Sequence, residues 1–104
     1  MTQLNTNSRG QLPALERWFD MKQAAKLIGI GIGRTTLFRY LRSEGFLMEN
    51  NESYQAFIDE GIFKLVLKDI RGRNGQLLFR QMVTLVSDTG IKLLKKYIAE
   101  NPVN

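Results

Sequence analysis

A run of basic and hydroxyl side chains between residues 34 and 43 has the residue types that contact nucleic acid. Arginine donates paired hydrogen bonds to phosphates and guanine edges, and threonine and serine hydroxyls bond to either. If the run is helical, these polar side chains gather opposite Leu37 and Leu41. The residues of this face are Thr35, Thr36, Arg39, Arg42 and Ser43, and Arg34, at the helix start, is expected to contact DNA with them. We therefore expect this face to contact double-stranded DNA.

A second group with similar chemistry lies between two stretches of alternating apolar residues. Arg71 and Arg73 flank Gly72, and Asn74-Gly75 precedes Gln76. Glycine allows the backbone to approach a sugar-phosphate chain closely, while guanidinium groups reach phosphates or a narrow minor groove. The alternative is that both arginines simply keep an exposed turn solvated. The DNA contacts expected in this group are Arg71, Arg73, Asn74 and Gln76.

Composition excludes most catalytic chemistry. The 104 residues include no histidine and no cysteine, so the usual general base, zinc ligands and thiol nucleophile are absent. Asp59 and Glu60 form an acidic pair, but adjacent side chains on an exposed turn point apart, and no further catalytic group converges on them. We predict that the chain is not an enzyme and has no cofactor, metal site or small-molecule substrate.

The charge balance favours a polyanionic partner. Fifteen lysines and arginines oppose ten acidic residues, which gives a net charge of +5. Charge alone does not choose between nucleic acid and a membrane surface. However, no apolar run approaches the roughly 20 residues that span a bilayer, and the N-terminus lacks the apolar centre of a signal peptide. We expect a cytoplasmic protein with no membrane partner.

Two short helices joined by a glycine-rich turn are predicted to position the first group, in a helix-turn-helix over residues 19–45. Asp20 and Gln23 have the spacing of a capping box, so the first helix begins at Met21, and Gly29 ends it. Its predicted buried side consists of Ala24, Ala25, Leu27 and Ile28.

The second helix is predicted over residues 34–44, with Leu37, Leu41 and one of Phe38 or Tyr40 turned inward. The turn from Gly29 to Gly33 is about two residues longer than the common helix-turn-helix link. It does not match a dinucleotide-binding loop, because that loop follows a strand and this turn follows a helix.

The second half of the sequence alternates as strands do. We predict a short strand over residues 46–48 and two long strands, at 62–70 and 77–86, joined through Asn74-Gly75 as a hairpin. Ser87 is expected to cap a final helix that ends at Asn101-Pro102. Before the helical pair, Pro13 to Trp18 is either a helical turn or a strand, and Trp18 and Phe19 are expected in the core.

These elements predict an α+β fold, a winged helix-turn-helix in which a helical pair is followed by a β-hairpin wing and a C-terminal helix. The helical pair and the hairpin together predict nucleic-acid binding more strongly than either does alone, because a basic hairpin tip or a basic helix face by itself is common on soluble proteins. The expected organisation is a flexible N-terminal arm at residues 1–11, the folded domain at 12–100 and a tail at 101–104.

Several segments resemble the KilAC domain, which is found at the C-terminus of many phage antirepressor proteins. The resemblance rests on AAKLIG with the following GRTTLFRYLRSEGFL, on YQAFIDEGIFKLV and on VTLVSDTGIKLL, and it extends from about Phe19 to Tyr97. It implies phage or prophage origin, a bacterial host cell and a role in transcriptional control. Those antirepressors usually carry another domain before the KilAC domain. Here only a short arm precedes it, so the chain is expected to be a stand-alone module.

Two functions remain open at this point. The first is a sequence-specific DNA-binding regulator that occupies an operator or promoter. The second is a protein-interaction module that binds and inactivates a phage repressor, through the same basic face or through apolar residues of the last helix. The expected partners are double-stranded DNA and, for the second function, a phage repressor protein; homodimerisation is left open.

Overall fold

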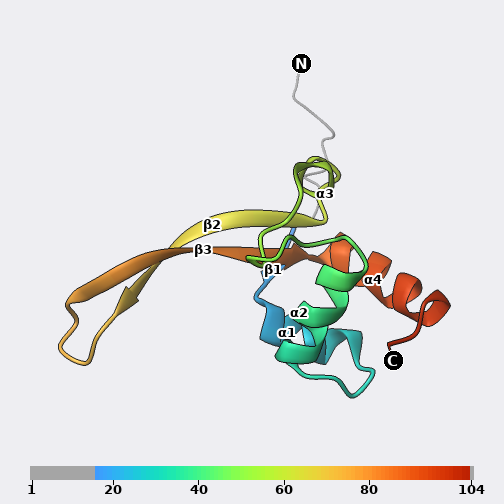
Figure 1. Ribbon diagram of the computed structural model, residues 1–104, viewed down its shortest axis with the longest axis horizontal. Helices are drawn as coiled ribbons and strands as arrows, with labels where there is room; N and C mark the ends of the chain where they lie inside the picture. Colours follow the sequence, from blue (N-terminus) through green and yellow to red (C-terminus); the bar gives the residue numbers. More distant parts are fainter. Residues whose placement is uncertain (1–15, 104) are drawn as a thin grey trace, which may run out of the picture.

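A computed structural model describes residues 16–103 as an α+β fold with four helices and a three-stranded antiparallel sheet (Figure 1). In chain order the elements are β1 (Trp18–Phe19), α1 (Met21–Ile28), α2 (Arg34–Ser43), α3 (Gln55–Asp59), β2 (Phe63–Arg71), β3 (Leu77–Ser87) and α4 (Asp88–Glu100). The strands are ordered β1-β3-β2. The predicted N-terminal arm lies outside the described residues, and the segment before α1 ends as a strand.

The helical pair forms where the sequence predicts it. The Asp20 carboxylate accepts a hydrogen bond from the Gln23 amide at 2.8 Å, and the Gln23 side chain accepts one from the Asp20 amide at 3.1 Å. Gly29 ends α1 at φ +75°, in the left-handed region that favours glycine. Leu37 and Leu41 of α2 are fully buried, and Tyr40 is the aromatic residue that turns inward. One face of α2 is therefore fixed and the other is exposed.

Two predictions about this half of the chain are wrong. Leu27 is 45% exposed, because it lies about a third of a turn around α1 from the stripe that Met21, Ala25 and Ile28 bury. Residues 46–48 do not form a strand of the sheet, and only Leu47 makes an isolated bridge. The cause is the tight end of α2, where the amides of residues 46 and 47 both donate to the Leu41 carbonyl.

The hairpin of β2 and β3 has a buried base and an exposed outer part. Phe63 and Val86 face each other at the base, where both are fully buried, and the pairing runs outward to Ile70 and Phe79. β1 pairs only with the last two residues of β3, Val86 and Ser87. Away from β1, the strands β2 and β3 leave the body together as a ribbon, shown at the left of Figure 1. We call residues 67–82 the hairpin arm.

Ser87 joins the sheet to α4. Its hydroxyl donates to the Gly61 carbonyl at 2.6 Å and accepts from the Gly90 amide at 2.8 Å, so it caps α4 as predicted. Gly90 is required there, since a Cβ would lie 2.6 Å from the Ile62 carbonyl oxygen. Arg17 also pairs with Asp88 at 3.0 Å, and this hydrogen-bonded contact lowers the pKa of the Asp88 carboxyl. The base of the hairpin is thereby fixed against the helices.

Replacing Leu41 by Ala should destabilise the fold by roughly 2–5 kcal/mol, because it opens a cavity between α2 and the core. Thermal unfolding followed by circular dichroism measures the effect. Leu27→Ala is the matched control, and its exposed side chain should cost no more than about 0.5 kcal/mol. Equal melting temperatures for the two variants would contradict the packing of α2 described above.

Candidate nucleic-acid interface

The predicted α2 residues lie on the exposed part of the helix but divide between two hollows. Arg34, Thr35 and Arg42 line a groove that faces the hairpin arm. A smaller pocket beside the C-terminal residues includes Thr36, Arg39 and Ser43. Thr35 and Arg39, which adjoin different hollows, are both exposed. The outer face of α2 therefore forms a ridge between the two hollows.

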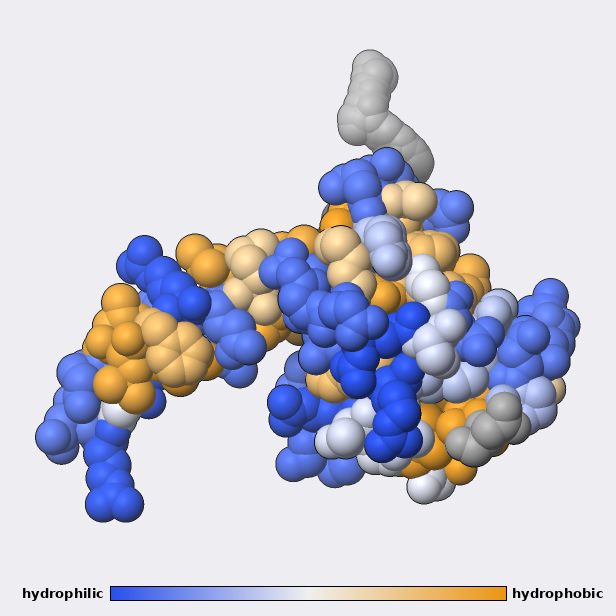
Figure 2. All heavy atoms as spheres, in the orientation of Figure 1, coloured by the Kyte–Doolittle hydropathy of each residue, from blue (hydrophilic) through white to orange (hydrophobic). Residues whose placement is uncertain are grey.

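The groove has a volume of about 870 Å³ and lies between the first two helices and the arm. Its basic lining residues are Lys22, Arg34, Arg42 and Lys68. Asp20 is the one acidic residue among those that line it, and its carboxylate caps α1. In Figure 2 the hollow appears below the arm, and hydrophilic residues cover the part of the body that faces it. The groove thus has the charge expected of a surface for a polyanion.

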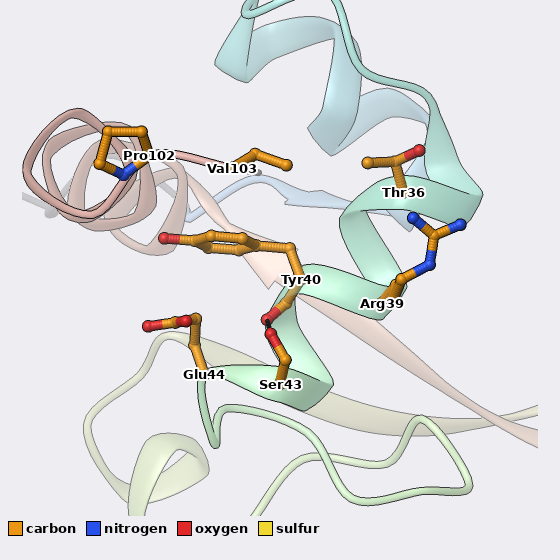
Figure 3. Close-up of a pocket in the computed structure, with 7 residues that line it drawn as sticks. All are labelled: Thr36, Arg39, Tyr40, Ser43, Glu44, Pro102 and Val103. Carbon is orange, nitrogen blue, oxygen red and sulfur yellow. Dashed lines mark hydrogen bonds between the residues drawn. The ribbon is translucent and has the colours of Figure 1, made fainter.

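Figure 3 shows the smaller pocket, whose volume is about 140 Å³. The Tyr40 hydroxyl donates to the Asn101 carbonyl, and the Tyr97 hydroxyl donates to Glu44 at 2.7 Å. Burial raises the pKa of Tyr40, and the hydrogen bond to Glu44 raises the pKa of Tyr97, so both phenols stay neutral at physiological pH. Arg39 extends away from the Tyr40 ring (Figure 3). Within residues 16–103 it makes no hydrogen bond or ion pair, so its guanidinium is available to a partner.

Asn51 links α2 to the hairpin, and sequence reasoning did not identify it. Its side-chain oxygen accepts a hydrogen bond from Arg42, and its carbonyl accepts one from the Thr84 hydroxyl at 2.8 Å. Its φ is +69°, a conformation that asparagine adopts more readily than most residues. The only signal in the sequence was an asparagine within the polar run from Glu49 to Glu52. Asn51 thereby holds the Arg42 side chain against the base of the hairpin.

Most of the predicted contacts at the hairpin tip help to build the turn. Arg71 donates to the Gly75 carbonyl at 3.0 Å and pairs with Asp69 at 3.2 Å. The Gln76 side chain accepts from the Asn74 amide at 3.2 Å and packs over Gly72.

Arg73 has no such contact within the described residues and is exposed, which makes it the guanidinium of the tip that a partner reaches most easily. Arg80, which was not among the predicted residues, pairs with Asp69 at 3.0 Å. The tip lies at the far end of the arm from α2, so the fold does not bring the two basic groups into contact (Figure 1).

Residues 16–103 offer no sign of two other kinds of site. No group of three or more acidic side chains is placed to hold a metal ion in this part of the chain. None of its helices has the length and apolar character needed to cross a membrane.

Comparison with known proteins identifies the family. The family model described as the phage antirepressor protein KilAC domain matches residues 14–101, which is most of the chain. No curated protein and no solved structure matches it. The match covers both helices of the helical pair, the hairpin and α4. The chain therefore belongs to the KilAC domain family of phage antirepressor proteins, and its function is related to that of antirepressors.

Proposed function

We propose that the chain is a sequence-specific DNA-binding transcriptional regulator of phage or prophage origin that acts in the cytoplasm of a bacterial host. In this proposal the KilAC domain has a winged helix-turn-helix arrangement. α2 enters the major groove, and the tip of the hairpin arm contacts the backbone or minor groove. The observation that carries the proposal is the exposed face of α2, where Thr35 and Arg39 lie opposite the buried Leu37 and Leu41.

The dimensions and charge of this face support the proposal. A ten-residue helix is about 15 Å long, and the major groove is about 12 Å wide, so α2 can lie in the groove and present several side chains to base edges. Arg34 and Lys22 line the adjoining hollow, where they are suited to the flanking phosphates.

The alternative is a module that binds and inactivates a phage repressor, and the family name is the observation that favours it. The apolar stripe of α4 is poorly available for that role, because Ile91, Leu94 and Ile98 are buried in the core. Such a module would use exposed side chains elsewhere, either the basic face of α2 or apolar residues of the hairpin arm such as Leu78 and Phe79. Binding to DNA should weaken steeply with salt, whereas a contact with a repressor through packed side chains should depend on salt only weakly.

Replacing Arg39 by Ala should weaken binding to the preferred DNA site while the fold remains intact. The loss should be about 1–3 kcal/mol if the guanidinium forms a bidentate pair with a base. Fluorescence anisotropy on the preferred and a scrambled duplex measures it. Lys95→Ala on α4 is the control with the same change in charge. Equal affinities of the two variants for the preferred site would show that Arg39 does not contact the DNA.

Replacing Arg71 and Arg73 together by Ala should weaken binding to all duplexes alike. The slope of log affinity against log salt should fall by about 1 for each phosphate that the protein no longer binds, when measured from about 50 to 300 mM salt. We expect Arg73→Ala alone to account for most of the change, because Arg71 already pairs with Asp69. The control, Lys92→Ala with Lys96→Ala, removes the same charge from α4. If the double variant and this control show the same dependence of affinity on salt, the tip does not contact DNA.

Asn51→Gly should reduce DNA affinity through Arg42, because glycine keeps the positive φ and removes only the side-chain acceptor. A double-mutant cycle tests the mechanism: once Arg42 is Ala, adding Asn51→Gly should cause little further loss of affinity. Fully additive losses would show that Asn51 acts independently of Arg42. Asn51→Ala serves as a comparison, since it adds backbone strain and should lower the melting temperature more than Asn51→Gly does.

A further inference from the structure

Phe79, near the outer end of the hairpin arm, is the exposed phenylalanine of this chain. The other five phenylalanines are buried or half-buried, whereas Phe79 is 54% exposed. Figure 2 shows hydrophobic residues gathered on this part of the arm, beside hydrophilic ones. A single exposed apolar side chain is common on protein surfaces, so its position and its neighbours decide whether it has a role.

The arm around Phe79 is basic and has a net charge of +3. Its charged residues are Lys68, Asp69, Arg71, Arg73 and Arg80. Asp69 pairs with both Arg71 and Arg80, and one carboxylate cannot offset two guanidinium groups. The arm therefore repels a second basic surface and attracts a polyanion such as DNA.

Phe79 lies on the face of the arm that turns toward the groove beside α2. Phe79 and Ile70 are directly opposite each other in the register, so their side chains share one face. At the outer end of the groove Ile70 is a lining residue, whereas Asp69 and Arg80, which occupy the opposite face, are not. A duplex that lies in the groove therefore meets the face that carries Phe79.

The pairing of the two strands changes register directly beyond Phe79. Ile70 pairs with Phe79 but Arg71 pairs with Leu77, so Leu78 is an extra residue on β3. A bulge of this kind strengthens the local twist and re-aims the neighbouring side chains. Leu78 is 56% exposed. Two adjacent exposed apolar side chains thus lie where the arm meets its basic tip.

The length of the arm matches the spacing of the grooves in DNA. Thr84 marks the level of α2, because Asn51 joins it to Arg42 through two hydrogen bonds. Phe79 lies five residues farther along β3, which is roughly 17 Å at the rise of an antiparallel strand. Adjoining major and minor grooves are centred about half a helical turn apart, which is also about 17 Å. With α2 in the major groove, Phe79 therefore reaches the adjoining minor groove.

We propose that Phe79 is an apolar wedge that inserts between two base pairs from the minor groove and bends the duplex that α2 reads. This inference rests on the proposed function and adds DNA bending to it. Apolar side chains of minor-groove proteins unstack a base step in this way and kink the duplex by about 20–90°. The phenyl ring is planar, so it can stack on the bases that it separates.

The neighbouring cations and the sequence of the DNA determine whether the kink is favourable. Lys68 and Arg73 are exposed on the two sides of Phe79 along the arm, where they are suited to the flanking phosphates. Their contacts offset part of the free energy that unstacking costs. Flexible pyrimidine–purine steps such as TA unstack most readily. We therefore expect such a step about half a turn from the base pairs that α2 contacts.

Resonance energy transfer between dyes at the two ends of the preferred duplex measures bending, and fluorescence anisotropy of the same duplex measures binding. The unmodified chain should raise the transfer efficiency when it binds. Phe79→Ala should bind the same duplex but leave it nearly straight, whereas Phe79→Leu keeps an apolar wedge and should still bend it. The matched control is Leu67→Ala, which removes a side chain that is 60% exposed on the opposite face of the arm and should leave the bend unchanged.

The outcomes separate this inference from the proposed function. A preferred duplex that stays straight when the unmodified chain binds it would overturn the wedge and leave Phe79 to a protein partner, while the reading of DNA by α2 still holds. Equal bending by Phe79→Ala and the unmodified chain, or equal loss of bending in Phe79→Ala and Leu67→Ala, would overturn the wedge too. A chain that prefers no duplex would overturn both proposals.

A second measurement uses the unmodified chain alone. The base analogue 2-aminopurine, placed at successive positions of the preferred duplex, brightens where it is unstacked. One step, about half a turn from the base pairs that α2 contacts, should brighten on binding. A mismatch at that step lowers the cost of unstacking and should tighten binding about tenfold or more, whereas a mismatch outside the site should change it little. If no position brightens, or if both mismatches have equal effects, Phe79 does not enter the base stack.

Discussion

The position of the Arg42 side chain relative to the hairpin depends on the contacts of Asn51. This residue accepts a hydrogen bond from Arg42 through its side chain and one from Thr84 through its carbonyl, so it joins the helix to the base of β3. Its left-handed backbone conformation allows one short loop to reach both partners. The buried Leu37 and Leu41 determine which face of α2 is inward. Asn51 determines where the Arg42 side chain lies in the groove. The proposed interface needs both constraints.

The hairpin divides into three parts with different chemistry. At its base Phe63 and Val86 are buried, and Ser87 connects the sheet to the N-terminus of α4. Along the arm, exposed apolar side chains such as Leu67 and Phe79 alternate with charged ones, and Asp69 pairs with Arg71 and Arg80. At the tip Arg73 projects without a partner among residues 16–103. A single supersecondary element can thus anchor to the core at one end and present a cation at the other.

Features governed by local rules were predictable from the sequence. The capping box at Asp20, the glycine that ends α1 and the Ser87 cap depend on residues within a few positions of each other, and the structure has all three. The hairpin strands also lie within one residue of their predicted ends, because alternation and the Asn-Gly turn define them.

Features that depend on distant packing were not predictable. The turn that closes α2 takes in residues 46 and 47, and the role of Asn51 requires Arg42 and Thr84 to lie on either side of it. The exposure of the arm was missed for the same reason. Alternating apolar residues indicate a strand but do not reveal that no element of the described chain covers its outer half. The family match supports the antirepressor-related function, and the reading of DNA by α2 is the proposal built on it.

The most direct test of that proposal is selection of bound sequences from a random duplex pool, carried out in parallel with the unmodified chain and with Arg39→Ala combined with Arg42→Ala. If α2 reads base edges, the unmodified chain should enrich one recurrent motif. The double variant should enrich none, although its fold is retained by circular dichroism. Enrichment of the same motif by both proteins, or of no motif by the unmodified chain, would contradict the account.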